Sequence, residues 1–305
     1  MEGAFALVDC LGWKGIWNRL DSKGRKVTTR QILQKVKKIQ DQITESTQTL
    51  KFGYKTFRVK VKPRVLFLSD TVVLSVPPVE HDEQDISDEI KGSLAVEMAS
   101  ILLTRIIDTF LEDEPYLTVR GCLTYGEHTV SRNYILGPAV DEAADNYEIS
   151  QGAFVWLHPK VTSKLEELWK WKDPYFQKAK LDALNQFSSD DAELVHKYLD
   201  ILYNPPFLIQ DYSMPLKGGD SFICSIVNPL FLIRDSDQRA KTIDRYVTSF
   251  DRATIDVLLK KQHTVSFLST AADATLAFYE NTFDPEFVEK LLETITPEPN
   301  NLSGP

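Results

Sequence analysis

AFALVDC, residues 4–10, is the stretch that decides the fold, and VLFLSD, residues 65–70, shares its character. Each stretch is hydrophobic on both faces, and each carries an aspartate at its end, Asp9 in the first and Asp70 in the second. Runs that are apolar on both faces are typical of central strands. A carboxylate there is costly to bury without a positive partner, and a divalent metal ion is the usual partner where two carboxylates converge. Asp9 and Asp70 are therefore candidate metal ligands, with aspartates that merely cap loops as the alternative.

The composition is that of an ordinary globular protein. The chain has 305 residues, of which 43% are hydrophobic and 26% are charged, enough for a sizeable core in one large domain or two. The net charge of −9 disfavours nucleic acid as the main partner, because proteins that bind nucleic acid generally are more often basic.

Nothing in the sequence predicts a membrane or secreted protein. No apolar run approaches the roughly 20 residues that cross a bilayer, and residues 1–4 lack the basic start of a signal peptide. Cys10, Cys122 and Cys224 are far apart in apolar surroundings, which is typical of buried thiols in a reducing compartment. We therefore expect a cytoplasmic protein.

The order of apolar patterns predicts alternating strands and helices. Ile32, Val36, Ile39 and Ile43, for example, fall at helical spacing. The expected elements are strands at about 4–10, 56–76, 117–124, 125–130, 154–157 and within 207–232, and helices from near Trp13, over 29–47, over 87–112, from near Ala139, over 160–171 and from 236 onward. Tight strand pairs within this alternation favour an α/β fold, an α+β sandwich in which helices flank a mixed sheet.

Four segments in this order resemble class III nucleotidyl cyclases, the adenylate and guanylate cyclase family. They are FALVDCLGW at 5–13, like the first metal strand; FLSDTVV at 67–73, like the second metal hairpin; VRGCLTYG at 119–126, like a glycine-containing strand pair; and LGPAVDEAA at 136–144, like the start of the catalytic helix. A fifth segment, PLKGG at 215–219, resembles the late hairpin whose lysine contacts the triphosphate. Each motif alone is weak, but four in register over roughly residues 4–150 are fairly specific.

The resemblance implies the ferredoxin-like mixed sheet of the cyclase fold and a division of the chain. Residues 1–235 are expected to form the catalytic domain, with an insertion at about 172–206. Residues 236–296 are expected to form a helical C-terminal extension, and residues 297–305 a disordered tail.

The resemblance also implies a chemistry for the two aspartates. In the family, two manganese or magnesium ions lie between such carboxylates and the triphosphate, where one activates the ribose 3′-hydroxyl and the other steadies the leaving pyrophosphate. Asp9 and Asp70 match those ligands, and the backbone carbonyl of Cys10 is expected as a further ligand. Phe5 matches a phenylalanine of the nucleotide site. Lys217 matches the phosphate contact, with a solvated turn lysine as the alternative.

The two positions that read a purine in the family differ in this chain. They hold Leu66, four residues before the second metal aspartate, and Tyr134, seven before the helix position usually occupied by asparagine. A leucine cannot hydrogen-bond a base edge, so a purine would keep unpaired polar groups, and Tyr134 is large enough to narrow the pocket towards a pyrimidine. The alternative for Leu66 is ordinary strand packing.

The catalytic helix differs as well. Asp141 and Asp145 stand where the family has asparagine and, four residues later, the arginine that stabilises charge on the transferring phosphate. An aspartate cannot supply that charge, so either the enzyme is inactive or another cation replaces the arginine. Asp141 is expected to hold the ribose instead. The candidate cations are Arg120, Arg132, Arg64 and Lys217.

The chain resembles the pyrimidine cyclases of bacterial Pycsar antiphage systems, on the basis of GPAVDEA at 137–143, the absence of purine-reading residues and the helical C-terminal extension. That resemblance implies conversion of UTP to cyclic UMP and diphosphate, with CTP to cyclic CMP as the near alternative. It also implies a homodimer with active sites at the interface and a separately encoded effector that senses the product. A catalytically silent, nucleotide-sensing module is the alternative from another functional class, and the missing asparagine and arginine favour it.

Overall fold

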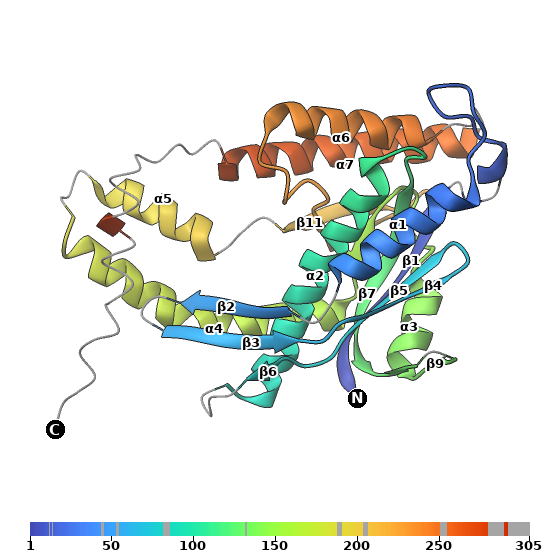
Figure 1. The fold of residues 1–305 in the computed structure, drawn as a ribbon. Helices are drawn as coiled ribbons and strands as arrows, with labels where there is room; N and C mark the ends of the chain where they lie inside the picture. Colours follow the sequence, from blue (N-terminus) through green and yellow to red (C-terminus); the bar gives the residue numbers. More distant parts are fainter. Residues whose placement is uncertain are drawn as a thin grey trace.

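The computed structural model describes residues 1–11, 13, 15–43, 46–52, 55–81, 86–131, 133–187, 191–203, 207–250, 255–279 and 290–291 (Figure 1). Its main element is a seven-stranded sheet in the order β11-β12-β10-β7-β1-β5-β4. β10 pairs with β7 in parallel, and the remaining neighbours in this sheet are antiparallel. Helices flank the sheet, so the predicted mixed α/β architecture is confirmed.

The first hydrophobic stretch forms β1 (Glu2–Leu11), which lies inside the sheet between β5 (Thr71–Val76) and β7 (Thr118–Glu127). Ala4, Phe5, Ala6 and Val8 are fully buried, as a central strand requires. Gly121 of β7 lies opposite Val8, and a Cβ atom there would come within 2.4 Å of the carbonyl oxygen of Leu7. Glycine therefore allows β1 and β7 to approach closely.

Six elements form a ferredoxin-like core in chain order: β1, α1 (Thr29–Gln42), β4 (Arg64–Leu68), β5, α2 (Asp88–Glu112) and β7. Their four strands lie in the order β7-β1-β5-β4, all antiparallel, which is the split βαβ arrangement. α1 begins at a capping box, in which the side chains of Thr28 and Gln31 each bond the backbone N–H of the other residue. The fold core thus follows from the two hydrophobic stretches and the two helical patterns.

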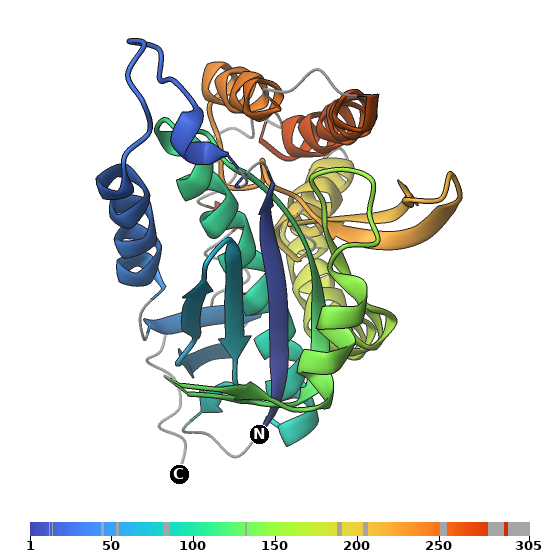
Figure 2. The same ribbon diagram turned by 90° about the vertical axis from the view of Figure 1, so that its right-hand side faces the viewer.

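The two faces of the sheet carry different helices (Figure 2). α2 packs against β1, β5 and β7 on one face and contributes to the main hydrophobic core along most of its length. α3 (Pro138–Asn146) packs against β1 and β7 on the other face, over a smaller cluster that contains Phe5, Val73 and Ala143. The alternation of β1 places Asp9 on the same face as Phe5, which is the α3 face.

The remaining elements extend the sheet beyond β7 and cover its edges. β10 (Val155–Leu157), β12 (Ser221–Val227) and β11 (Leu208–Pro215) complete the sheet, and the β11–β12 hairpin projects from it in Figure 2. α4 (Pro159–Leu184) and α5 (Ala192–Tyr203) lie between them in the chain. Two smaller sheets comprise β2 (Ser46–Phe52), β3 (Lys55–Val61) and β6 (Glu80–His81), and β8 (Thr129–Val130) with β9 (Ile135–Leu136).

The C-terminal helices α6 (Ser236–Ser249) and α7 (Ile255–Tyr279) share the main core (Figure 1). Phe267 of α7 packs edge-on against Phe154 at a ring-centroid distance of 5.3 Å. The backbone N–H of Ala153 donates a hydrogen bond to Thr264 Oγ1 (2.9 Å), and Asn228 Nδ2 donates one to Thr275 Oγ1 (3.0 Å). Both bonds are buried, so α7 is joined to the sheet by satisfied polar groups as well as by apolar contact.

Several sequence predictions were wrong at element boundaries. Trp13 lies outside any helix, and only the short 3-10 helix η1 (Ile16–Asn18) follows β1. The helix predicted over 29–47 ends at Gln42, and a strand begins at Ser46. The strand pair predicted over 117–130 is mainly one long strand, β7. The helix predicted over 160–171 continues through Pro174 to Leu184, so the insertion expected at 172 begins inside α4.

Two further expectations concern the C-terminal tail and membrane-spanning helices. Residues 297–305, for which a disordered tail is predicted, lie outside the described residues. Among the helices that the structure does describe, none combines the length and the apolar character needed to span a bilayer.

Candidate active site

The two aspartates lie next to each other at one end of the sheet. Asp9 of β1 lies opposite Thr71 of β5, and Asp70 directly precedes Thr71 in the turn that joins β4 to β5. The backbone N–H of Cys10 donates a hydrogen bond to the carbonyl oxygen of Asp70 (2.8 Å), which fixes the turn against β1. The two carboxylates therefore come from neighbouring strands of the ferredoxin-like core.

The turn that carries Asp70 has an unusual backbone. β4 and β5 are joined by only two residues, and the first, Ser69, has φ of 61°. This left-handed conformation favours glycine and costs a non-glycine residue roughly 1–2 kcal/mol. Such strain persists only where the surrounding structure holds it, and here it presents Asp70 beside Asp9.

Asp9 has one cationic partner among the described residues. Arg120 of β7 lies directly opposite Asp9 and donates from Nε (3.3 Å) and Nη2 (3.2 Å) to Asp9 Oδ2. Burial raises the pKa of the Asp9 carboxyl, Arg120 opposes that rise, and the nearby Asp70 and Glu148 carboxylates add to it. A half-buried carboxylate with a raised pKa gains from a further positive charge.

The partners of Arg120 continue into a network of four charged side chains. Arg120 Nη2 also bonds Glu148 Oε1 (3.0 Å), and Lys217 Nζ bonds Glu148 Oε2 (3.0 Å). Lys217 lies at the tip of the β11–β12 hairpin, whose backbone is fixed by a hydrogen bond from the Lys217 N–H to Ile149 O (3.0 Å). The hydrogen bond to Lys217 lowers the pKa of Glu148, so this carboxyl is ionised at neutral pH.

Glu148 is the member of this site that sequence reasoning missed. It follows α3 by two residues and belongs to no recognisable motif. Its role depends on the β11–β12 hairpin folding back onto residues 149–151, a contact between segments almost 70 positions apart. Since the chain pattern around Glu148 is ordinary, no sequence signal separates it from a solvated glutamate.

The donor set beside the aspartates fits a hard divalent cation. Asp9 Oδ1 and the Asp70 carboxylate carry no ion pair with a described residue, and the Cys10 carbonyl accepts a long bond from the Trp13 N–H (3.4 Å). Burial raises the pKa of the Cys10 thiol well above its usual range, so the sulfur stays protonated and the carbonyl is the donor at that residue. Magnesium typically uses one or two carboxylates and completes its shell with water and substrate phosphates. Within the described ranges, no three acidic, histidine or cysteine side chains gather in a metal-binding group.

The residues assigned to the nucleotide base lie along the α3 face rather than around Asp9. Phe5 is fully buried, and Leu66 packs at the margin of the same apolar cluster. Asp141 is exposed on the first half of α3, and Tyr134 is 52% exposed in the turn between β8 and β9. The side chain of Phe5 is thus closed off by α3 within one chain.

Within one chain, Tyr134 lies far from Asp9 and Asp70. Arg120 lies opposite Asp9, whereas Glu127, at the other end of β7, lies opposite Glu2 and leads into β8. Glu127 is seven residue steps along β7 from Arg120, a distance of about 23 Å. Tyr134 follows β8, so it belongs to the far end of the sheet.

The candidate replacements for the missing arginine are divided in the same way. Arg120 and Lys217 lie in the charged network beside Asp9. Arg64 lies at the far end of β4, where its Nη1 donates to Val130 O (2.5 Å). Arg132 lies outside the described residues.

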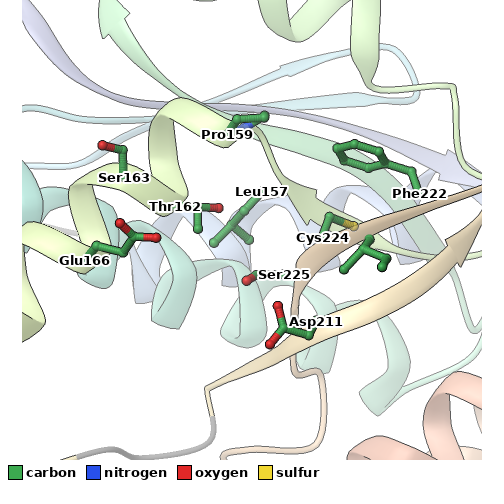
Figure 3. A pocket seen from close by; sticks show the side chains of 10 residues that line it. Leu157, Pro159, Thr162, Ser163, Glu166, Asp211, Phe222, Cys224 and Ser225 are labelled. Atoms are coloured by element: carbon green, nitrogen blue, oxygen red, sulfur yellow. The ribbon is translucent and has the colours of Figure 1, made fainter.

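A cavity of about 320 Å³ lies away from the aspartates, between α4 and the β11–β12 hairpin (Figure 3). Leu157 and Ser225 line it, together with the carboxylates of Glu166 and Asp211. By strand alternation Trp156 shares the face of Asp9, so Leu157 points to the opposite face of the sheet. The cavity is therefore separate from the Asp9–Asp70 site.

No family model matches the chain, and no curated protein matches it. Several chains of solved structures resemble part of it, and two of them are guanylyl cyclases. The catalytic core of a rhodopsin-guanylyl cyclase with converted specificity, in complex with ATPαS, is 13% identical over 53% of this chain and 79% of that chain, with a TM-score of 0.33. The guanylyl cyclase Cya2 is 15% identical over 55% of this chain and 81% of that chain, with a TM-score of 0.29. Both TM-scores lie below 0.5, so neither likeness carries a conclusion about function.

Proposed function

We propose that the chain is a nucleotidyl cyclase of the class III type, which converts UTP to 3′,5′-cyclic UMP and diphosphate. The observation that carries this proposal is the placement of Asp9 and Asp70 side by side on the ferredoxin-like core, with Arg120 and Lys217 next to them. Two carboxylates beside two cations suit a metal-bound polyphosphate.

In the proposed reaction, the ribose 3′-hydroxyl loses its proton to solvent and its oxygen bonds to the α-phosphorus. The bond between the α-phosphorus and the oxygen that it shares with the β-phosphorus breaks, and diphosphate leaves with that oxygen. Asp9, Asp70 and the Cys10 carbonyl would hold manganese or magnesium, two ions in each site, which favour the 3′-oxyanion and neutralise the phosphates. Lys217 and Arg120 bind phosphate oxygens, and their charge offsets the negative charge that grows on the leaving diphosphate. Arg120 is thereby the strongest candidate to replace the missing helix arginine.

The base preference rests on what Leu66 and Tyr134 lack. Leu66 offers no hydrogen bond to a purine edge, and the exposed Tyr134 offers one large ring and a single hydroxyl. A smaller pyrimidine leaves fewer polar groups unpaired. UTP is the preferred substrate and CTP the alternative.

The separation of Tyr134 and Asp141 from the aspartates supports a homodimer. One copy supplies Asp9 and Asp70, and the second supplies the base and ribose contacts from its α3 face, with Asp141 on the ribose. This arrangement gives two equivalent active sites at one interface. The large side chains of Leu68, Tyr134 and Leu136 are each more than half exposed. A dimer interface would shield such side chains from water.

A catalytically silent module is the second candidate, and one observation favours it. Arg120 already pairs with Asp9, so the repulsion between Asp9 and Asp70 is partly offset without a metal ion. Asp141 and Asp145, in place of asparagine and arginine, point the same way. In that case the chain would bind a nucleotide without converting it.

The cellular role is part of the same proposal and rests on the resemblance of residues 137–143, together with the absence of purine-reading residues and the helical C-terminal extension. Cyclic UMP would act as a second messenger in antiphage defence, made in the cytoplasm and sensed by a separate effector. Neither nucleic acid nor a membrane is expected as a partner.

The test is to incubate the purified chain with each of ATP, GTP, CTP and UTP plus manganese and to identify products by mass spectrometry. Cyclic UMP from the wild type, and none from Asp70→Ala, is the expected result. A cyclic purine would overturn the interpretation of Leu66 and Tyr134. No cyclic product from any nucleotide, with nucleotide binding retained, would establish the silent module instead.

A further inference from the structure

Glu148 connects two cations that come from different parts of the fold. Its Oε1 bonds Arg120 Nη2 and its Oε2 bonds Lys217 Nζ, each at 3.0 Å. Arg120 belongs to a central strand, and Lys217 belongs to the tip of a projecting hairpin. A single anion that bridges an arginine and a lysine is also how such side chains bind a phosphate group.

The Arg120 side chain and the backbone of Lys217 are held in place without Glu148. Arg120 is 8% exposed, extends from β7 and is fixed by two bonds to Asp9. Lys217 is fixed through its backbone, since its N–H bonds Ile149 O and the neighbouring Leu216 pairs with Ser150. Removing the Glu148 carboxylate therefore leaves two cations facing the same point rather than two displaced side chains.

Glu148 is the more exposed partner of Arg120. Its side chain is 47% exposed, lies in the segment between α3 and β10 and also shares a hydrogen bond with the Tyr147 side chain. Its pair with Lys217 is open to solvent on both sides, and such pairs contribute little to stability. A phosphate group that reaches Arg120 and Lys217 from solvent can therefore compete with the Glu148 carboxylate for them.

We propose that Glu148 occupies the position of a substrate phosphate group in the ligand-free chain and competes with that group for Arg120 and Lys217. This inference rests on the proposed function, because it assumes that a polyphosphate binds beside Asp9. It assigns Glu148 an inhibitory role: its carboxylate lowers the affinity for diphosphate and triphosphate until it moves aside. The opposite role, in which Glu148 positions Lys217 for the substrate, predicts the opposite change in affinity.

The test compares the binding of inorganic pyrophosphate, with magnesium present, to the wild type and to Glu148→Gln by isothermal titration calorimetry. The variant keeps the size of the side chain and removes its charge. We expect its dissociation constant to fall by about tenfold, the factor that corresponds to about 1.4 kcal/mol, which is the scale of one charge-assisted hydrogen bond. Adding Lys217→Met to the Glu148→Gln variant should cancel most of the gain.

Glu193→Gln is the matched control, because Glu193 is an exposed glutamate on α5, outside the proposed site, with no ion pair to a described residue. It should bind pyrophosphate as the wild type does. Unchanged or weaker binding by a folded Glu148→Gln variant, judged by its circular dichroism and thermal unfolding, would overturn the inference.

Nucleotide turnover, measured separately, keeps the two proposals apart. Tighter pyrophosphate binding by Glu148→Gln with no cyclic product from any nucleotide supports the competition and contradicts the proposed enzyme. Cyclic UMP from the wild type without tighter binding by the variant supports the enzyme and contradicts the competition.

Discussion

Replacing Asp70 by asparagine should have two opposite effects, and together they test the physical basis of the proposed metal site. In the ligand-free chain, Asp70 contributes to the raised pKa of Asp9, so the two carboxylates repel each other. Asp70→Asn removes that repulsion and keeps the side-chain size. It also keeps the pairing of Asp9 with Arg120, because that pairing does not involve Asp70.

The size of the effect follows from Coulomb's law. Side chains of opposite and diagonal residues on neighbouring strands lie about 4.5–8 Å apart, and we take about 7 Å for Asp9 and Asp70. At that separation, two unit charges repel by about 2.4 kcal/mol at an effective dielectric constant of about 20 and by about 0.6 kcal/mol at about 80. Since both side chains are partly solvated, we expect a gain of about 1 kcal/mol in the free energy of unfolding, or roughly 1.5 °C in Tm for a chain of this length.

Manganese should reverse the order of thermal stability of the wild type and Asp70→Asn. It is expected to stabilise the wild type through Asp9 and Asp70 and to have little effect on Asp70→Asn, because a ligand stabilises only the folded state that binds it. The assay is thermal unfolding followed by circular dichroism, with and without manganese, and Asp145→Asn serves as the exposed control. A ligand-free Asp70→Asn variant that is less stable than the wild type, with the same manganese response, would refute this reasoning.

Three further substitutions test the frame around the site. Ser69→Val should lower the free energy of unfolding by about 1–2 kcal/mol because a β-branched residue resists φ of 61°, whereas Ser69→Gly should not lower it; equal Tm values for the two variants would contradict the strained turn. Gly121→Ala should destabilise the chain by about 1–3 kcal/mol, since the added Cβ meets the Leu7 carbonyl oxygen at 2.4 Å, and urea unfolding measures the loss. Burial lowers the pKa of His128, which bonds Ser75 Oγ (2.7 Å), so folding should weaken as pH falls below the ordinary histidine pKa of about 6.5; His128→Gln should reduce that dependence, and parallel slopes between pH 7.5 and about 5.5 would speak against it.

The sign of the His128 effect follows from proton linkage. A histidine whose pKa is lowered in the folded state binds fewer protons there than in the unfolded chain. Stability is therefore fully present above the unfolded pKa and is lost as pH falls through the folded pKa. The measurement is urea unfolding at several pH values, with the wild type and the variant compared at each one.

The part of the fold that sequence could predict is the part with strong periodic patterns. The hydrophobic stretches at 4–10 and 65–70 became β1 and β4, and the helix predicted over 87–112 is α2 almost to the residue. These segments are buried on most sides, so their apolar pattern directly reflects their position. The adjacency of Asp9 and Asp70 followed from two such strands meeting in one sheet.

The errors arose where local pattern and tertiary contact disagree. Two strands were predicted at 117–124 and 125–130, but β7 continues from Thr118 to Glu127, and Gly121 within it allows the close approach of β1. A helix was predicted over 160–171, yet α4 continues through Pro174 to Leu184. Neither cause can be read from neighbouring residues, because each depends on what packs against the segment.

Only some residues of the site could be predicted from the sequence. Asp9 and Asp70 end recognisable strands, and Arg120 lies in a recognisable glycine-containing segment. Glu148 joins the site only because the β11–β12 hairpin folds back to residues 149–151. That contact also decides which candidate cations are near Asp9, since it places Lys217 there, whereas pairing with Val130 places Arg64 at the other end of the sheet.

The central claim is that Asp9 and Asp70 together bind the catalytic metal ion, and the most direct test is anomalous X-ray diffraction from crystals of the full chain grown with manganese and UTP. The account predicts an anomalous peak within bonding distance of carboxylate oxygens of both residues, and no such peak in crystals of Asp70→Asn. Crystals that contain bound UTP but no manganese beside these residues, with Arg120 as the sole cationic partner of Asp9, would contradict it.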